Sequence, residues 1–200
     1  MDRIRFDEHG LVPCVMQDAR TGEVLTLAYM NEEALARTRE TGEVHFWSRS
    51  RGELWRKGET SGNTMRLRAL RYDCDDDALV ALVDPAGPAC HTGERSCFYR
   101  GDTDPTTGEA LTVLERTIAE RKGAAEPGSS YTAELLADPR RLGEKVREEA
   151  DEAARAAAGE TDRRLGEEAA DLLYHLAVLM ASRGLDLGDA FEELNRRRAG

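Results

Sequence analysis

Aspartates occupy positions 73, 75 and 77 of the segment YDCDDDA, which we expect to end a β-strand. Alternate side chains of a strand share a face, so Asp73, Asp75 and Asp77 are expected to project together while Cys74 points to the opposite side. Carboxylates held this close repel one another unless a hard cation neutralises them, and Mg²⁺ prefers oxygen ligands. The spacing therefore indicates a magnesium site, with a solvated acidic turn as the alternative.

Thiols in the same half of the chain offer a second metal site. Cys74, with Cys90 and Cys97 of the segment CHTGERSC, could supply three sulfur ligands to zinc. A fourth, open position would hold a water that becomes hydroxide near neutral pH and attacks an electrophilic carbon. Buried free thiols are the alternative, and for Cys14, inside an apolar strand, this core interpretation is favoured. His91 could be a ligand, a group that orients a ligand, a general base or an exposed loop histidine.

Carboxylates also share one face of two expected helices in the second half. They are Glu148, Glu149 and Glu152 of KVREEADEAARAA, and Glu168 and Asp171 of the next helix. Residues three and four apart lie on one face of a helix, so two antiparallel helices could turn these groups inward around Mg²⁺ and a polyphosphate. Residue chemistry alone favours a solvated acidic face with basic partners. Those partners are Lys145, Arg147, Arg155 and Arg164.

A basic, hydroxyl-rich segment, FWSRSRGELWRKGETSGN, precedes the aspartates. Hydroxyls, cations and backbone N–H groups exposed by glycine are what a phosphate monoester needs, and tryptophan can stack on a base. The groups concerned are Ser48, Arg49, Ser50, Arg51, Arg56, Lys57, Thr60 and Ser61. As composition alone, a basic loop is weak support for a phosphate site.

Short β-rich runs must position these groups in the first half. They cover residues 12–18, 23–30, 43–49, 65–75 and 78–84, and turn signals such as TGE, RGE and DPAGP separate them. One helix over residues 31–40 interrupts them, with Asn31 placed as its N-cap and Gly42 just past its end. We therefore expect a β-rich α+β domain over residues 1–105.

The second half, after the linker GDTDPTTGEA, is dominated by Ala, Leu, Glu and Arg at helical spacing. Thr112 followed by Glu115 predicts a capping box that opens a helix over residues 112–122. Further helices are expected over residues 140–158, 162–182 and 188–197, with a loop at residues 123–132. Residues 106–200 therefore read as a second, all-α domain.

Composition argues against two kinds of partner. The 200 residues include 28 basic and 39 acidic side chains, a formal net charge of −11, whereas a general nucleic-acid binder needs a basic surface. The N-terminus lacks the apolar run of a signal peptide, and the stretch LLYHLAVLMA is too short to cross a bilayer. We expect a cytoplasmic protein with no nucleic-acid or membrane partner, in which disulfides are not expected.

The strings WSRSRGELWRKGETSGN, DCDDD and CHTGERSCF, in this order, resemble the phosphoribosyl-AMP cyclohydrolases of histidine biosynthesis over about residues 10–100. The resemblance implies hydrolytic opening of the adenine ring of phosphoribosyl-AMP between N1 and C6, giving the ProFAR imidazole-carboxamide. It implies zinc at the three cysteines, magnesium at the three aspartates, proton handling by His91, and a homodimer, because family members draw the zinc thiolates from more than one subunit. The implied substrate contacts are Trp47, Ser48, Arg49, Ser50, Arg51, Lys57, Glu59, Thr60, Ser61 and Asn63. Asn63 stands where many members have the histidine of GETSGH.

The string EEADE, followed after 15 residues by EAAD, fits the EExxE…ExxD pattern of all-α, MazG-like NTP pyrophosphohydrolases. With SSYTAELL and AADLLYHLAVLM beside it, the segment over about residues 111–198 resembles phosphoribosyl-ATP pyrophosphohydrolase more closely. The resemblance implies a helical bundle in which Glu148, Glu149, Glu152, Glu168 and Asp171 bind or support Mg²⁺, with Glu149 and Glu152 catalytic. Further implied substrate contacts are Lys122, Ser130, Tyr131 and Lys145. Arg147 replaces the small residue expected in KVGEE.

Together the two resemblances imply a bifunctional hydrolase for two consecutive steps. The second domain would hydrolyse phosphoribosyl-ATP to phosphoribosyl-AMP and pyrophosphate, and the first would open the purine ring of that product. Two alternatives keep the cyclohydrolase but make the helical half a general NTP pyrophosphatase or a silent dimerisation module. A non-enzymatic zinc-binding protein is a further alternative, and it leaves the basic segment without a role.

Overall fold

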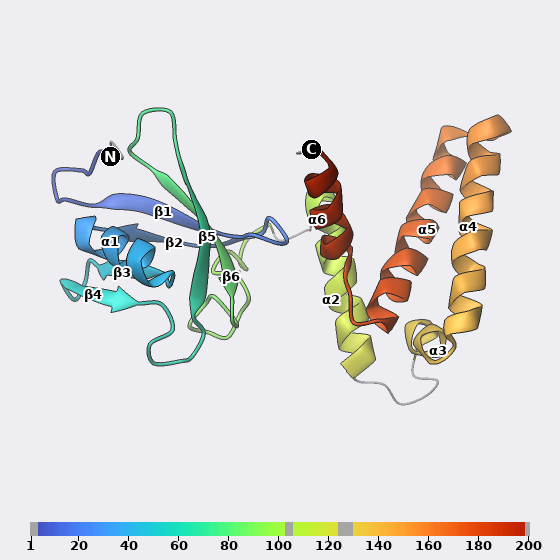
Figure 1. Cartoon of the computed structure of the whole chain (residues 1–200), viewed down its shortest axis with the longest axis horizontal. Helices are drawn as coiled ribbons and strands as arrows, with labels where there is room; N and C mark the ends of the chain where they lie inside the picture. The colour runs from blue at the N-terminus through green and yellow to red at the C-terminus, as the bar shows by residue number, and fades with distance from the viewer. Residues whose placement is uncertain (1–3, 103–105, 124–129, 199–200) are drawn as a thin grey trace. The chain divides into compact units, whose positions relative to one another are not determined.

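The computed structural model describes residues 4–102, 106–123 and 130–198, and the chain divides into two compact units, Met1–Asp104 and Pro105–Gly200 (Figure 1). The described residues of the first unit form strands and one helix, and those of the second form helices. The expected combination of a β-rich α+β fold with an all-α fold is confirmed. The expected boundary between residues 105 and 106 adjoins residues 103–105, which lie outside the described residues.

A four-stranded sheet forms the centre of the first unit, in the order β2–β1–β6–β5. The central strand β1 (Val12–Asp18) pairs antiparallel with β2 (Val24–Met30) and parallel with β6 (Leu79–Pro85). β5 (Met65–Tyr72) pairs antiparallel with β6 and forms the other edge. Along β1, buried residues alternate with half-buried ones, because one face of the strand covers the core.

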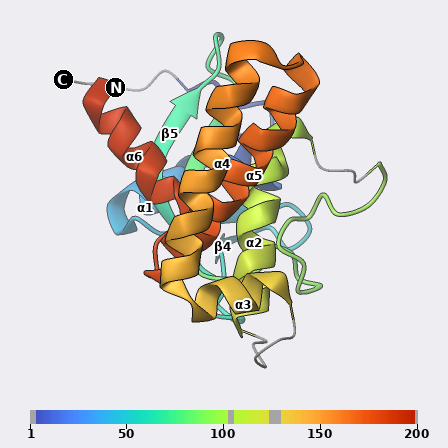
Figure 2. The ribbon, with the colours of Figure 1, turned by 90° about the vertical axis from the view of Figure 1, so that its right-hand side faces the viewer.

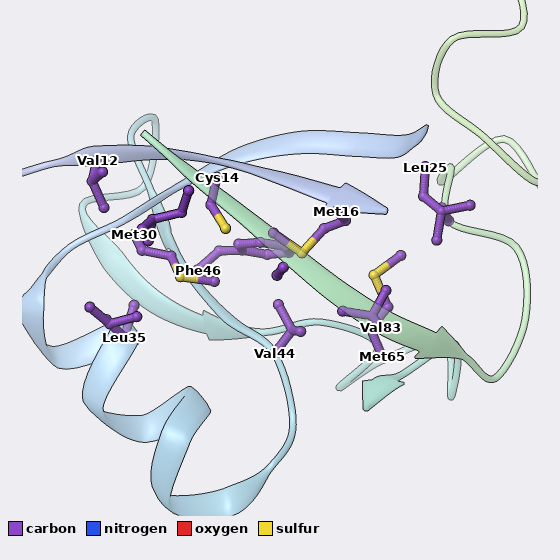
Figure 3. Packing of buried hydrophobic residues seen from close by; sticks show 14 residues of the cluster. Val12, Cys14, Met16, Leu25, Met30, Leu35, Val44, Phe46, Met65 and Val83 are labelled. Atoms are coloured by element: carbon purple, nitrogen blue, oxygen red, sulfur yellow. The ribbon is translucent and has the colours of Figure 1, made fainter. Parts of the chain in front are cut away.

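The core of the first unit lies between this sheet, the helix α1 (Glu32–Thr41) and the strand that follows α1 (Figure 3). Cys14 and Met16 of β1 and Phe46 of the strand after α1 point into it, and each is at most 2% exposed. Burial raises the pKa of the Cys14 thiol to about 12, so this thiol stays protonated. The core interpretation of Cys14 is confirmed.

Helix α1 begins and ends at the expected residues. Asn31 accepts a hydrogen bond from the backbone N–H of Ala34 at 2.8 Å. Gly42 follows the last turn with a φ of 71°, the left-handed conformation that glycine adopts without a steric penalty. The local capping signals therefore fix both ends of α1.

A hairpin replaces part of the expected basic loop. β4 (Glu53–Arg56) pairs antiparallel with β3 (His45–Ser48), although no strand is expected over residues 53–56. Trp55 packs against Phe46 with ring centroids 5.6 Å apart, and Gly52 supplies the positive φ of the tight connection. A strand of four residues is too short to show an alternating pattern, so the cross-strand aromatic contact determines this hairpin.

The described residues of the second unit begin with a short 3₁₀ helix, η1 (Thr107–Glu109), and continue in five α-helices. They are α2 (Ala110–Gly123), α3 (Tyr131–Ala137), α4 (Pro139–Gly159), α5 (Asp162–Ser182) and α6 (Leu187–Arg198). Both views show α4 and α5 side by side, with α3 at the end where α4 begins (Figures 1 and 2). Apolar side chains from α2, α3, α4 and α5 make up the core of this unit.

Two sequence expectations for the second unit are wrong. The capping box lies at Thr106 and Glu109, where the Glu109 carboxylate accepts the N–H of Thr106 at 2.7 Å, and Thr112 already lies inside α2. Helix α3 begins inside the stretch expected to be a loop, because Ser130 accepts the N–H of Ala133 at 3.2 Å and caps it. Nowhere in the described part of the chain does a helix combine the length and apolarity needed to span a membrane.

Candidate active sites

The segment from Cys90 to Cys97 folds back on itself and brings its two cysteines into contact. Cys90 is 6% exposed, Cys97 is exposed, and neither forms a disulfide. The Thr92 hydroxyl donates to Cys90 Sγ at 3.1 Å, and this bond, with a smaller effect from Cys97, lowers the pKa of the Cys90 thiol. Burial raises the pKa of Cys97. A paired site with one thiol poised to ionise fits a soft metal ion such as zinc.

Cys74 lies elsewhere in this unit. It is exposed in the turn that follows β5 and contacts the Asp75 carboxylate at 3.8 Å. Within the described residues, the two groups that could hold a metal with three ligands are Asp73–Asp75–Asp77 and Glu149–Glu152–Glu168, so one chain does not gather the three cysteines. The structure brings Cys90 and Cys97 together and leaves Cys74 apart.

A cavity of about 480 Å³ opens beside the thiol pair and reaches His91 at its rim. It is lined by five of the ten expected substrate residues, Lys57, Glu59, Thr60, Ser61 and Asn63. A second hollow of about 360 Å³ is lined by the rest, Trp47, Ser48, Arg49, Ser50 and Arg51. Phe46 and Trp55 line both, so the two hollows adjoin across the β3–β4 hairpin.

Lys57 is the buried cation of this cavity. Its side chain donates to the backbone carbonyl of Asn63 at 3.3 Å, and the residue is 7% exposed. Burial lowers the pKa of Lys57, while the nearby Cys97 and Cys90 thiols act in the opposite direction. A cation held between thiols and an open cavity can bind an anionic substrate and favour ionised thiols.

Gly58 and Asn63 show why the turn after Lys57 needs its residue types. Gly58 has a φ of +81°, and a Cβ there would lie 2.4 Å from the Asn63 carbonyl carbon. The Asn63 side chain in turn packs against Gly87, where a Cβ would lie 2.4 Å from Asn63 Oδ1. The Asn63 side chain therefore fits because residue 87 is a glycine and leaves room for it.

The three aspartates meet in a turn, and the expectation that they project from the end of a strand is wrong. β5 ends at Tyr72, and Asp73 Oδ1 accepts the N–H groups of Asp77 at 2.9 Å and Ala78 at 3.1 Å. The turn places carboxylate oxygens of Asp73, Asp75 and Asp77 within 4.8 Å of one another. Hydrogen bonding with Asp73 and repulsion from Asp75 raise the pKa of Asp77. Such a set of oxygen ligands fits a hard divalent cation.

Helices α4 and α5 enclose the second acidic group. Ligand atoms of Glu149, Glu152 and Glu168 lie within 4.8 Å of one another, and Glu149 and Glu168 are 5% and 2% exposed. Burial raises the pKa of Glu168, and Arg164 on the same helix forms an ion pair with it that acts the other way. The buried Glu168 Oε1 is the atom that pairs with Arg164, and it makes no further hydrogen bond within the described residues. Three carboxylates this close, two of them buried, fit an additional cation such as Mg²⁺.

The other expected ligands of this site lie outside that group. Glu148 is exposed and binds Lys145 at 2.9 Å, and this contact lowers the pKa of Glu148. Asp171 is exposed, and its backbone carbonyl accepts a hydrogen bond from His175 Nδ1 at 2.9 Å. One chain therefore gathers three of the five carboxylates.

Of the four implied substrate contacts of the helical unit, two lie beside the acidic group and two are engaged in other hydrogen bonds. Lys145 Nζ lies 3.1 Å from Glu149 Oε1, and Tyr131 Oη lies 3.3 Å from His175 Nε2, beside the acidic group. Ser130 is used as the cap of α3, and Lys122 donates to the carbonyl of Ala181 at 2.7 Å. His175 Nδ1 lies 3.6 Å from Glu149 Oε1, and its position one turn beyond Asp171 is the sequence signal for this contact.

Glu168→Gln is expected to raise the melting temperature of the metal-free protein by a few degrees at neutral pH. A carboxyl whose pKa is raised in the folded state resists ionisation, so folding gains stability as pH falls through that pKa, and glutamine mimics the neutral form. Mg²⁺ should reverse the order and stabilise the wild type more. Thermal melts with and without Mg²⁺ measure both effects, with the exposed neighbour Glu167→Gln as control. A lower melting temperature for metal-free Glu168→Gln would contradict the burial argument.

The fold and these sites define a class of protein before any comparison is made. The first unit joins a thiol pair to a cavity with a buried lysine and a basic hairpin, and the second surrounds a carboxylate group with helices. Both arrangements suit metal-assisted hydrolysis of phosphorylated substrates. The chain is thus a two-site hydrolase with one site in each unit.

Comparisons with known proteins agree for both units. Family models match residues 26–99, as phosphoribosyl-AMP cyclohydrolase, and residues 111–198, as phosphoribosyl-ATP pyrophosphohydrolase. The histidine biosynthesis bifunctional protein HisIE of Bacillus subtilis is 48% identical over 202 residues, covering 99% of this chain and 96% of the relative. HisIE of Gloeobacter violaceus is 49% identical (97% and 90% covered) and that of Thermus thermophilus 47% (100% and 95%).

The chain belongs to this family of bifunctional histidine-biosynthesis proteins. It is an enzyme with phosphoribosyl-AMP cyclohydrolase and phosphoribosyl-ATP pyrophosphohydrolase activities. The expectation of a bifunctional hydrolase is confirmed.

Proposed function

We propose that the helical unit cleaves phosphoribosyl-ATP at the α–β phosphate linkage and that the first unit then opens the N1–C6 bond of the adenine ring. The observation that carries this proposal is the buried carboxylate group of α4 and α5 on the same chain as a thiol-lined cavity. Feeding phosphoribosyl-ATP to the whole chain with Zn²⁺ and Mg²⁺ tests it. Phosphoribosyl-AMP should appear first and the ring-opened product second, and an equal turnover of ordinary NTPs would favour a general pyrophosphatase.

Zinc is the proposed metal of the thiol pair. Bound there, it would act as a Lewis acid and lower the pKa of a bound water to near neutrality. Cys90 and Cys97 are the ligands from one chain, and the lowered pKa of Cys90 favours its thiolate. Free thiols at this site need a reducing compartment, which supports a cytoplasmic enzyme.

The walls of the two hollows bind and orient the nucleotide. Lys57 and the hydroxyls of the turn after it receive one phosphate, and Arg49 and Arg51 of the adjoining hollow receive the other. Trp55, shared by both hollows, offers a ring face to the base. His91 Nδ1 lies 3.9 Å from Cys90 Sγ at the cavity rim, and we assign this imidazole the delivery of a proton to N1 as the N1–C6 bond breaks.

A second copy of the chain would complete the zinc site with its Cys74. The separation of Cys74 from the thiol pair within one chain supports this arrangement. Exposed apolar side chains next to the pair also support it: Val24 is 42%, Leu27 45% and Phe98 59% exposed. The Ser96 hydroxyl donates to the Val24 carbonyl at 2.8 Å, which joins the segment before Phe98 to strand β2. A homodimer would cover this surface.

Mixing two inactive variants tests the shared site. In a symmetric dimer of Cys74→Ser with Cys90→Ser, one site loses both residues and the other keeps a complete set. Refolding the variants together should therefore restore about a quarter of wild-type ring opening, because about half of the dimers are mixed and each has one intact site. A mixture of Cys90→Ser with Cys97→Ser is the control and should stay inactive. No recovery in the first mixture would show that Cys74 does not act across subunits.

Magnesium is the proposed ion at both carboxylate groups. In the helical unit it would neutralise the polyphosphate and activate a water, with Glu149, Glu152 and Glu168 as ligands. Lys145 bridges Glu148 and Glu149, so it holds the ligand face of α4 and places a positive charge at its edge. In the first unit, the turn of Asp73, Asp75 and Asp77 would bind the second ion.

A further inference from the structure

Two backbone hydrogen bonds close the loop that lies between Cys90 and Cys97. The N–H of Ala89 donates to the carbonyl of Arg95 at 3.0 Å, and the N–H of Cys90 donates to that of Glu94 at 3.0 Å. These bonds place Cys90 across the loop from Glu94 and its neighbour Ala89 across from Arg95. Beyond the loop, the N–H of Cys97 donates to the carbonyl of Leu25 in β2 at 2.8 Å. The position of one thiol relative to the other therefore depends on how the residues between them are fixed to the β1–β2 hairpin.

Arg95 makes that attachment through its side chain. Its guanidinium donates through Nη2 to Asp18 Oδ2 at 2.6 Å and through Nε to Glu23. Asp18 ends β1, and its side chain is 5% exposed. Although burial disfavours the charge of Arg95, the ion pairs with Glu23 and Asp18 raise its pKa. Arg95 is thus a permanent cation tied to two carboxylates that are distant in the sequence.

The receiving carboxylate is itself rigid. Asp18 Oδ1 accepts the N–H groups of Arg20 at 2.8 Å and Thr21 at 3.1 Å, which fixes the turn after β1. The backbone N–H of Asp18 donates to the Glu23 carbonyl at 2.9 Å and closes the same turn. A planar guanidinium with two donors in use sets direction as well as distance, so the turn fixes the orientation of Arg95.

Arg95 does not act on the substrate directly. The cavity beside the thiols and the adjoining hollow are lined by residues among which Arg95 does not occur, although both Cys90 and Cys97 line the cavity. The side chain points toward the β1–β2 turn, where it contacts Asp18 and Glu23. Its contribution must therefore pass through the backbone of the loop to the thiols.

We infer that Arg95, anchored by Asp18 and Glu23, is a positioning residue that holds Cys90 and Cys97 at the separation a metal ion requires. The inference rests on the proposed zinc role of the two thiols. Residues that orient metal ligands typically change metal affinity by about 10- to 100-fold when replaced. Lysine at position 95 keeps the positive charge but cannot contact Asp18 and Glu23 with the geometry of a guanidinium. Arg95→Lys should therefore lose part of the zinc affinity, and less of it than an uncharged residue does.

The test compares Arg95→Met, Arg95→Lys and Asp18→Asn in the full chain. Arg68→Gln is the matched control, because Arg68 forms an exposed ion pair of the same kind with Asp84 between β5 and β6. Zinc affinity is measured by competition with a chelator. The alkylation rate of each cysteine is measured by mass spectrometry on zinc-free protein, and the pyrophosphohydrolase activity of the same molecules is the folding control for the second unit.

We expect Arg95→Met to raise the zinc dissociation constant by about 10- to 100-fold, with Arg95→Lys and Asp18→Asn between it and the wild type. Cys90 should alkylate faster in the zinc-free variants while Cys14, buried in the core, stays protected. Wild-type zinc affinity together with wild-type Cys90 alkylation in Arg95→Met would overturn the inference. Loss of ring opening with unchanged zinc affinity would overturn it too, because Arg95 would then act on substrate.

Two further outcomes are also decisive. If Cys14 becomes reactive in Arg95→Met, the first unit has unfolded, and the milder variants Arg95→Lys and Asp18→Asn take over the test. Weakened zinc binding in these variants, with Cys14 still protected, supports the inference. Wild-type zinc affinity in both of them overturns it. If the wild-type chain binds no zinc, the proposed zinc role fails by itself. The alkylation rates need no metal, so they still report whether Arg95 fixes the thiol loop.

Discussion

Cys90→Ser is expected to abolish zinc binding and ring opening together and to leave pyrophosphohydrolase activity intact. The serine hydroxyl is not ionised at neutral pH and is a poor ligand for a soft metal site, whereas the Cys90 thiol has a lowered pKa. Charge stabilisation by a bound metal is worth several kcal/mol, so ring opening should fall by at least about 1000-fold. Zinc content and the rate of product formation from phosphoribosyl-AMP measure the two losses.

The same chain supplies the controls for Cys90→Ser. Serine is close to cysteine in size, and Cys90 lies in a loop rather than among the strands, so the first unit should keep its fold. Cys14→Ala removes a thiol from the core, and it should lower stability without lowering zinc content. Full ring opening by zinc-free Cys90→Ser would exclude the zinc assignment, because no other described thiol contacts Cys97 in this way.

Local signals explain which parts of the fold could be predicted from the sequence. Asn31 and Gly42 define α1 because an N-cap and a left-handed glycine act over one turn of chain. The strand β4 and the helix α3 were not predicted for a related reason: each is short, so neither shows a hydrophobic period. Their formation depends on the Phe46–Trp55 contact and on packing of α3 against α4 and α5.

The aspartate group was predicted with the right members and the wrong geometry. Alternation along a strand and the turn after β5 both bring Asp73, Asp75 and Asp77 together, but only the turn satisfies Asp73 with the N–H groups of Asp77 and Ala78. Composition marked the metal-binding potential of the segment. The backbone conformation, including the positive φ of Asp76, could not be read from an apparent strand period.

Contacts between distant segments account for the rest of the site. Arg95 pairs with Asp18 and Glu23, which lie 77 and 72 residues earlier, and no periodicity connects these positions. Residue spacing on α4 and α5 correctly suggested the pairing of Glu149 and Glu152 with Glu168. It did not exclude Glu148 and Asp171, because a helical wheel does not show which edge of a face is covered by a neighbouring helix.

Glu152→Gln is expected to lower phosphoribosyl-ATP hydrolysis by at least about 100-fold, since the metal it helps to hold contributes several kcal/mol to the reaction. Glutamine keeps the size of the side chain and removes its charge, so α4 should remain folded. Glu152 is also the least buried member of the acidic group, and its exposed ion pair with Arg155 at 3.1 Å adds little stability. Pyrophosphate release measures the loss, and Mg²⁺ should no longer raise the melting temperature.

The matched control for this variant is Glu144→Gln, two turns earlier on α4, where an exposed Glu144 pairs with Arg140 at 3.3 Å. It removes the same charge outside the acidic group and should hydrolyse phosphoribosyl-ATP at the wild-type rate. Both variants should open the ring of supplied phosphoribosyl-AMP normally, because that reaction belongs to the other unit. Wild-type pyrophosphate release by Glu152→Gln would place the pyrophosphohydrolase site elsewhere. If the wild-type helical unit releases no pyrophosphate in the presence of Mg²⁺, its carboxylates do not form a working metal site. That result would favour the silent module instead.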